Sequence, residues 1–203
     1  MKLYYKPGAC SLASHIILKE IASDFEIESV DTANQVAESG ADFSKINPKG
    51  YVPVLDIGEG QILTEGAAIL QYLADQNPDA DLAPEFGTLE RARLQEHLSF
   101  TSTELHKAFG PFFSPNASDE EKQVAKKNVE KKMEHFESIF KDGRKYLLGD
   151  KFSVADAYLF VVSGWAIPTG IGLDKWPRVA AYSKRVAGRE KVQEAMHAEG
   201  LLN

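Results

Sequence analysis

The chain has 203 residues, of which 43% are hydrophobic and 26% charged, and its formal net charge at pH 7 is −7. This size suits one large domain or two small ones, and the acidic balance excludes duplex binding through a general basic surface. A single cysteine excludes an intrachain disulfide, and no run approaches the roughly 18 apolar residues of a transmembrane helix.

These properties indicate no nucleic-acid partner and no membrane partner. Lys2 is followed by no apolar stretch before Pro7, so we expect no signal peptide. Without an export signal, and with one thiol, the default location is a reducing cytoplasm.

The first 80 residues predict short strands that alternate with helices. Apolar side chains recur at helical spacing after Cys10, and residues 25–31 alternate apolar and polar side chains as a half-buried strand does. The predicted order is a strand at 2–6, a helix at 11–22, a strand at 25–31, an irregular stretch, strands at 52–58 and 61–64, and a helix at 65–76. This order predicts a small mixed sheet flanked by helices.

The stretch 77–88 interrupts this pattern with two prolines and a glycine, Pro78, Pro84 and Gly87. Such residues are typical of a connection between domains. We therefore place a linker at about 77–86 and expect an N-terminal domain at 1–80 and a C-terminal domain at 87–203.

Beyond the linker the sequence predicts helices alone. They cover 89–109, 118–141, a helix opening at Ser153, and two short helices near 177–187 and 189–197. Capping boxes pair Ser118 with Glu121 and Ser153 with Asp156. The helix after Ser153 is apolar nearly all round, which predicts a buried central helix. The predicted fold class is therefore α+β.

Cys10 lies between the predicted first strand and the first predicted helix. A lone cysteine is commonly a small buried apolar residue. At a helix N-terminus, however, the unpaired N–H groups and the helix dipole favour an anion and lower a thiol's pKa. Because no second cysteine is available to resolve a disulfide, a redox role for Cys10 requires the second thiol to come from a ligand.

Two further segments have features that suit the binding of a peptide ligand that carries a thiol. A cis Val52–Pro53 bond would leave the Val52 backbone facing outward to pair with an extended peptide, whereas a trans proline would only begin a strand. Glu65 and Gly66 open a predicted helix, where the N–H groups can hold a carboxylate and Glu65 an ammonium. The alternative is that Glu65 only complements the helix dipole.

One face of the predicted helix 89–109 is polar. Ser99, Thr103 and His106 share it, with Lys107 beside them. Such a face is normally solvated, but a histidine within reach of a thiol can assist proton transfer. The other histidines show no metal-binding spacing, so we expect no metal site.

The whole chain resembles cytosolic-type glutathione transferases of the bacterial beta class. The resemblance lies in MKLYYKPGACSLASHI, NPKGYVPVL, LTEGAAILQYLAD, TELHK and FSVADAYLF. It implies a thioredoxin-like N-terminal domain, an all-α C-terminal domain and a homodimer.

The resemblance also implies roles for individual residues. Cys10 would contact the glutathione sulfur or form a mixed disulfide with it, and Val52, before a cis Pro53, would pair with the cysteinyl backbone. Glu65 and Gly66 would hold the γ-glutamyl end. The remaining expected contacts are Thr103, Glu104, which would act across the dimer interface, and His106, near the sulfur.

The sequence departs from the class at two positions. Gln35 stands where a lysine is typical and Ser99 where an asparagine is typical. Gln35 can still donate a hydrogen bond, but it removes a charge that would meet the glycyl carboxylate, so we expect weaker binding. Tyr5 could be mistaken for the activating tyrosine of other classes, and we interpret it as a packing residue.

We therefore expect a glutathione transferase that acts in detoxification. It would conjugate glutathione, as co-substrate and without another cofactor, to small hydrophobic electrophiles held between the domains, with thiol–disulfide exchange through Cys10. His106 would assist as a second catalytic group. The alternatives on this scaffold are a dehalogenase, isomerase or peroxidase, and a non-catalytic binding or regulatory protein.

Overall fold

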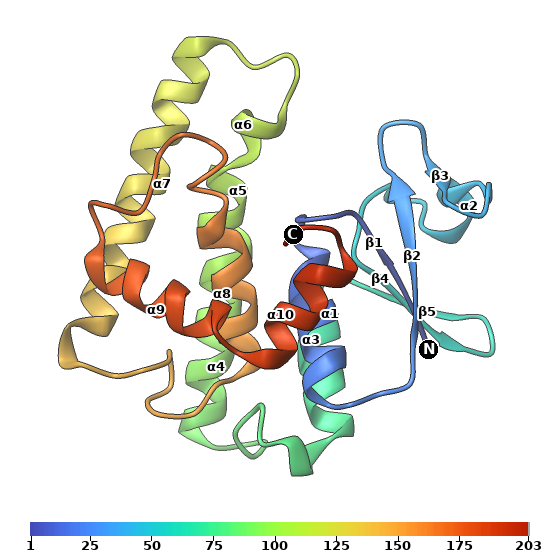
Figure 1. Cartoon of the computed structure of the whole chain (residues 1–203), viewed down its shortest axis with the longest axis horizontal. Helices are drawn as coiled ribbons and strands as arrows, with labels where there is room; N and C mark the ends of the chain where they lie inside the picture. Colours follow the sequence, from blue (N-terminus) through green and yellow to red (C-terminus); the bar gives the residue numbers. More distant parts are fainter. Residues whose placement is uncertain (203) are drawn as a thin grey trace. The chain divides into compact units, whose positions relative to one another are not determined.

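The computed structural model describes residues 1–202 (Figure 1). Contacts between residues divide it into two compact units, which are described separately. Unit 1 consists of Met1–Ala83 together with the chain from Gly188 onward, and unit 2 of Pro84–Ala187. The segment after Gly188 thus clusters with unit 1, although it follows the helical unit in the chain. The domain boundaries expected from the sequence, 1–80 and 87–203, stay a prediction.

Unit 1 is a mixed sheet covered by helices. Its strands lie in the order β3-β2-β1-β4-β5, with β1 parallel to β2 and the other neighbours antiparallel. The elements are β1 Lys2–Tyr5, α1 Ser11–Glu20, β2 Glu26–Asp31, β3 Val36–Ala37, α2 Phe43–Ile46, β4 Val54–Gly58, β5 Gln61–Thr64, α3 Gly66–Gln76, a 3-10 turn Pro78–Ala80 and α10 Glu190–Ala198. The expected mixed sheet is confirmed, and β3 and α2 fill the stretch that had been expected to be irregular.

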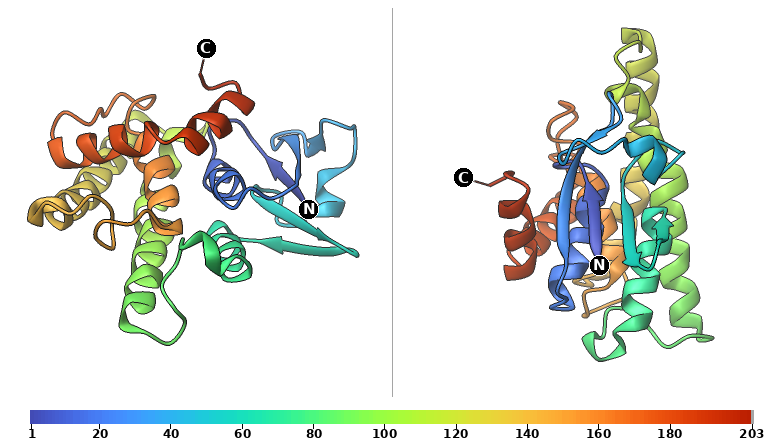
Figure 2. Two further views of the ribbon diagram at one scale, coloured as in Figure 1. Left: turned by 60° about the horizontal axis from the view of Figure 1, so that its bottom comes forward. Right: turned by 90° about the vertical axis from the view of Figure 1, so that its right-hand side faces the viewer.

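The central strand β1 is buried on both faces. Tyr4 packs against Phe43 of α2, with ring centroids 5.9 Å apart, while Tyr5 faces His15 of α1 at 6.1 Å. Successive strand residues point to opposite faces, so α2 lies on one side of the sheet and α1 on the other. Helices α1 and α3 lie side by side on their face (Figures 1 and 2).

Helix α10 packs along α1 and brings a buried carboxylate to the turn before Cys10. The Glu199 side chain is fully buried. One of its oxygens accepts the Gly8 N–H at 3.0 Å and the other lies 2.9 Å from His15 Nδ1. At the other end of α10, Arg189 makes a two-pronged ion pair with Glu20 at 2.8 and 2.9 Å. These contacts fix the last helix of the chain onto the first.

Unit 2 is helical throughout its described elements, which confirms the prediction of helices alone. They are α4 Leu89–Phe100, a π-helical segment η2 Thr101–Leu105, α5 His106–Ala108, α6 Gly110–Phe113, α7 Asp119–Ile139, a 3-10 turn Phe140–Asp142, α8 Val154–Gly164 and α9 Pro177–Ala187. The single helix predicted at 89–109 therefore changes its winding at Thr101. One stripe along these turns is buried; it consists of Leu94, Leu98, Thr101 and Leu105.

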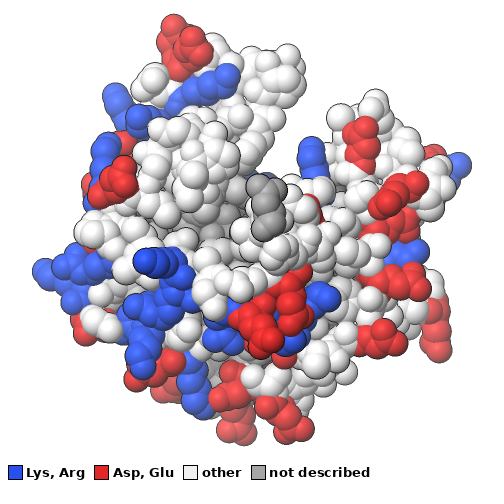
Figure 3. Space-filling model, in the orientation of Figure 1, with Lys and Arg blue, Asp and Glu red and all other residues white. Residues whose placement is uncertain are grey.

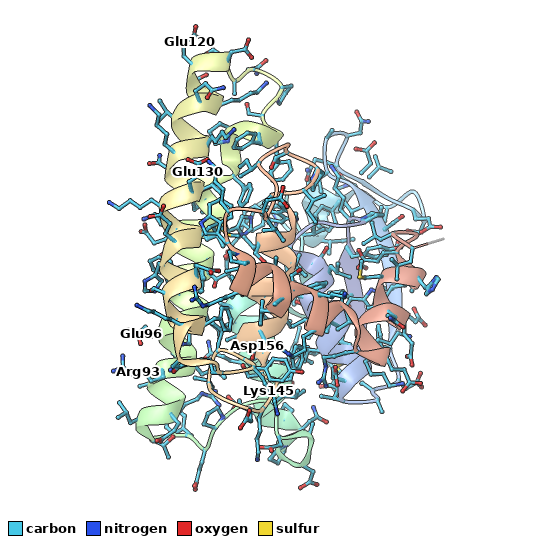
Figure 4. All side chains as sticks on the ribbon, turned by 60° about the vertical axis from the view of Figure 1, so that its left-hand side comes forward. Arg93, Glu96, Glu120, Glu130, Lys145 and Asp156 are labelled. Atoms are coloured by element: carbon cyan, nitrogen blue, oxygen red, sulfur yellow. The ribbon has the colours of Figure 1, made fainter. Side chains whose placement is uncertain are left out.

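Helix α8 is the buried centre of unit 2, as its apolar sequence predicts. Every residue of Val154–Ser163 is buried. The predicted capping box at its start is present. The Asp156 carboxylate accepts the Ser153 N–H and hydroxyl at 2.9 and 2.7 Å, and the Leu147 N–H at 2.8 Å (Figure 4). Burial raises the pKa of Asp156 to about 6, against three donors that favour its charged form.

Acidic and basic side chains lie interspersed over the outer surface of unit 2 (Figure 3). Two ion pairs of this kind join Lys175 to Glu130 and Arg178 to Glu137. In both pairs the basic side chain is exposed and the glutamate is partly buried, and surface pairs in general contribute little to stability. Within residues 1–202, no helix combines the length and the apolar character needed to cross a membrane.

We predict that Asp156→Asn destabilises the protein. The two carboxylate oxygens accept from three protein donors, and the amide replaces one of these oxygens with an N–H₂ donor, so at least one buried donor loses its acceptor. The expected loss is about 2–3 kcal/mol, or roughly 5–10 °C in Tm for a chain of this size. Thermal unfolding at pH 7 measures it.

Glu121→Gln is the matched control for Asp156→Asn, because it changes the same position of the exposed capping box at Ser118. There the amide oxygen can still accept and water can satisfy the rest, so we expect a loss below about 0.5 kcal/mol. Equal losses in the two variants would contradict the account of Asp156.

Candidate active site

Cys10 stands where the turn after β1 meets the first turn of α1. The turn is closed by the Ala9 N–H, which donates to the Lys6 carbonyl at 3.0 Å, and by the Ser11 hydroxyl, which contacts both backbone groups of Lys6. Cys10 has φ −59° and ψ −21°, so its backbone already follows the helix. The thiol is half-buried, and the expected position at a helix N-terminus is confirmed.

The structure brings Cys10 to Val52. The thiol donates to the Val52 carbonyl, with Sγ and O 3.4 Å apart. The Val52–Pro53 peptide bond is cis, as hypothesised from the sequence. The Val52 side chain lies in the core cluster with Tyr4 and Phe43, so its side chain anchors the segment while its backbone carbonyl faces the thiol.

Glu65 directly precedes α3 and has an unusual backbone. Its φ is +70° and ψ is 111°, a conformation rare for a residue with a side chain. Gly66 is the first residue of α3. The carboxylate makes no capping hydrogen bond to the helix. Its Oε1 instead accepts from Lys49 Nζ at 2.7 Å and from the Tyr51 hydroxyl at 2.6 Å.

The Gln35 side chain is used inside unit 1. Its amide Nε2 donates to the Thr32 carbonyl at 2.6 Å and to the Gly50 carbonyl at 2.9 Å. The donor expected to face a ligand carboxylate therefore joins two loops. Lys49 and Tyr51, which do reach a candidate site residue, were missed by sequence reasoning. The segment NPKGYVPVL contains both, but nothing in its local pattern indicates that they point at Glu65.

Unit 2 brings together the remaining candidates on consecutive turns. The Thr103 hydroxyl donates to the Ser99 carbonyl at 3.0 Å, and Glu104 makes an ion pair with Lys132. Ser99, Thr103, Glu104 and Lys107 are exposed, whereas His106 is half-buried. Thr103 and Glu104 lie within the π-helical segment Thr101–Leu105, a feature frequent at functional sites, whereas Ser99 precedes it and His106 and Lys107 follow it.

His106 lies in an aromatic setting. Its Nδ1 is 2.9 Å from the Tyr158 hydroxyl, and its ring meets Trp165 edge-on with centroids 4.8 Å apart. Burial, with a smaller contribution from the charge of Lys107, lowers the pKa of His106 to about 4. The imidazole is therefore neutral near pH 7 and can only donate or accept a hydrogen bond there.

The two hydroxyl-bearing side chains next to Cys10, Tyr5 and Ser11, are buried. Tyr5 is 8% exposed and lies against His15, and burial raises the pKa of its phenol. Ser11 is fully buried and closes the turn. Across residues 1–202 there is no group of three or more His, Cys, Asp or Glu side chains arranged to hold a metal ion. The turn thus leaves the half-buried Cys10 thiol next to the Val52 carbonyl.

Comparison with known proteins gives matches over both units. The glutathione S-transferase N-terminal domain matches residues 1–75 and the glutathione S-transferase C-terminal domain residues 100–190. The chain is 45% identical to glutathione S-transferase GstA of Escherichia coli O157:H7, over 99% of this chain and 100% of that protein.

Solved structures agree with these matches. The bacterial beta class glutathione S-transferase of Sphingomonas chungbukensis is 48% identical, with a TM-score of 0.96 over 100% of both chains. A sphingomonad glutathione S-transferase complexed with glutathione is 46% identical, with a TM-score of 0.95 over 100% of both chains. With both domains matched and this identity along the full length, the chain belongs to the glutathione S-transferase family.

Proposed function

We propose that this protein is a glutathione transferase that conjugates glutathione to small hydrophobic electrophiles and exchanges disulfides through Cys10. The observation that carries the proposal is the Cys10 thiol at the start of α1, 3.4 Å from the carbonyl of Val52 before the cis Pro53. A sulfur ligand aligned with Val52 would lie against both the thiol and the helix N-terminus, which favours a thiolate.

Glutathione is the proposed co-substrate, with no other cofactor. Val52 would pair with the cysteinyl backbone in the manner of an added strand. Glu65 and Gly66 would bind the γ-glutamyl end, which carries an ammonium and a carboxylate. Thr103, Glu104 and His106 would supply further contacts, with Ser99 and Lys107 beside them. Gln35 would contribute through the loop that it fixes.

Two reactions follow from one bound thiolate. In conjugation the glutathione thiol loses its proton, the thiolate forms a bond to the electrophilic carbon, and the leaving group departs with its electron pair. In exchange a thiolate attacks one sulfur of a disulfide and the other sulfur leaves as a thiolate. Cys10 would be the protein partner in the second reaction, and neutral His106 a hydrogen-bonding partner of the sulfur.

The proposal also includes the setting of the enzyme. We infer a cytoplasmic homodimer acting in detoxification, in which Glu104 serves the neighbouring subunit's site. The lone thiol suits a reducing compartment. Equilibrium sedimentation of the full chain tests the dimer, and a monomer at micromolar concentration would contradict it.

Titration calorimetry with reduced glutathione tests the binding step directly. We expect heat of complexation at millimolar ligand or below, and retention on immobilised glutathione with elution by the free tripeptide. The sphingomonad relative is complexed with glutathione in its solved structure. No measurable binding of reduced or oxidised glutathione would overturn the proposed function.

Cys10→Ala separates the two reactions. Without the thiol, reduction of a mixed disulfide should fall by about 100-fold or more, since the attacking or resolving sulfur is gone. Conjugation should fall by about tenfold or less, because the helix N-terminus still stabilises the ligand thiolate. Initial rates at saturating glutathione measure both, with Cys10→Ser as the isosteric control. Undiminished disulfide reduction would refute the exchange activity.

His106 should not titrate in the working range. Its folded-state pKa of about 4 lies below the reference of roughly 6.5, so the ring is neutral from pH 5 to 8. We expect His106→Gln to lower the conjugation rate by a constant factor across this range. The same variant should lose less stability than the parent as pH falls from about 6.5 to 4, where the unfolded histidine binds a proton first. A change in the shape of the pH–rate profile between 5 and 8 would contradict a neutral imidazole.

A further inference from the structure

Two side chains of the loop before Val52 donate hydrogen bonds to the Glu65 carboxylate. Lys49 Nζ and the Tyr51 hydroxyl both reach the same oxygen, Oε1, at 2.7 and 2.6 Å. Lys49 also donates to the Thr64 hydroxyl at 2.9 Å. Two residues of the segment just before Val52 thus converge on the residue that opens α3, which no local helix contact explains.

The loop of residues 47–51 is itself held by hydrogen bonds from Asn47 and Gln35. The buried Asn47 donates through Nδ2 to the Tyr51 carbonyl at 2.7 Å, and the Gly50 N–H donates back to the Asn47 carbonyl at 2.9 Å. Gln35 contributes its hydrogen bond to the Gly50 carbonyl. These three hydrogen bonds to the backbone of residues 47–51 therefore hold this loop, and they fix the positions of Lys49 and Tyr51.

Glu65 needs such support. Its φ of +70° lies in the region that favours glycine, although the residue carries a side chain. Backbones of this kind cost free energy and persist where the surroundings hold them, often at ligand sites. An exposed glutamate also loses side-chain freedom when it binds a ligand, and contacts that order it beforehand reduce that loss.

The geometry points to Lys49 and Tyr51 as positioning residues that hold the Glu65 carboxylate ready for the α-ammonium of the γ-glutamyl group. This inference rests on the proposed function and adds to it the residues that set the affinity for that end of glutathione. Both donors keep their protons near pH 7, because the hydrogen bond to Glu65 raises the pKa of Tyr51 and of Lys49.

Tyr51→Phe is the decisive variant, because it removes one hydroxyl and no charge. The KM and Kd for glutathione should rise about 3–10-fold, the range that a single hydrogen bond is worth. The kcat at saturating glutathione should stay within about twofold, because Tyr51 acts on binding and not on the sulfur. Calorimetry gives Kd, and conjugation of a chloronitrobenzene gives KM and kcat.

Variants of Lys49 test the ion pair between Lys49 and Glu65. Lys49→Gln should weaken glutathione binding less than Tyr51→Phe does, since removing the cation also relieves its repulsion of the ligand ammonium. Lys49→Arg should retain the parent's Kd. The matched control is Lys45→Gln, for which no change in Kd is expected, because Lys45 is exposed and pairs with Asp42.

A double-mutant cycle distinguishes positioning from direct contact. In a Glu65→Gln background Tyr51→Phe should have little further effect on Kd, because the group that it orients has lost its charge. An N-acetylated glutathione, which lacks the ammonium, should bind the parent and Tyr51→Phe proteins alike.

Three results would overturn the inference while leaving the proposed function intact. They are an unchanged Kd in Tyr51→Phe, an equal effect of Tyr51→Phe in the Glu65→Gln background, and an equal effect on the acetylated ligand. Tighter binding by Lys49→Gln would also overturn it, because Lys49 would then compete for Glu65. Failure of the parent protein to bind glutathione would instead overturn the proposed function, and the inference with it.

Discussion

The arrangement of unit 1 depends on a carboxylate without solvent contact. Glu199 lies just beyond α10, close to the end of the chain, yet its two oxygens reach the Gly8 N–H and the His15 imidazole. A buried acceptor of this kind must be satisfied, because an unpaired polar group in the interior is costly. Its partners are the turn before Cys10 and the helix that follows it, so one side chain fixes the angle between them.

The thiol is placed by this constraint from one side and by the sheet from the other. Leu201 packs over Gly8, whose φ of +69° suits a glycine, while the Val52 side chain is anchored in the core under α2. Because both segments are fixed, the Cys10 thiol and the Val52 carbonyl meet without either needing to move. A thiol next to an acceptor backbone and a helix N-terminus is a preorganised place for another sulfur.

In unit 2 the candidate residues lie in or next to the π-helical segment Thr101–Leu105. The run around this segment is otherwise α-helical, and the buried Thr101 and Leu105 mark the segment's two ends. Burial, with a smaller contribution from Lys107, lowers the pKa of His106, and Tyr158 of α8 and Trp165 of the turn after it lie against the imidazole ring. The capping box at Ser153 fixes the start of the helix that carries Tyr158, the hydrogen-bond partner of His106.

The sequence by itself determined the local elements and the family. Capping boxes and hydrophobic periodicity act over about four residues, so the starts of α7 and α8 and the helix that follows Cys10 could be predicted directly from the sequence. The two-residue β3 and the four-residue α2 were not predicted, because segments this short show no hydrophobic periodicity. Only the tertiary structure decided which distant groups meet. The hydrogen bonds of Glu65 to Lys49 and Tyr51, of Gln35 to Gly50 and of Glu199 to Gly8, like the neutral state of His106, arise from packing between segments far apart in the chain. No local pattern records such contacts, because burial and partner geometry exist only once the chain has folded.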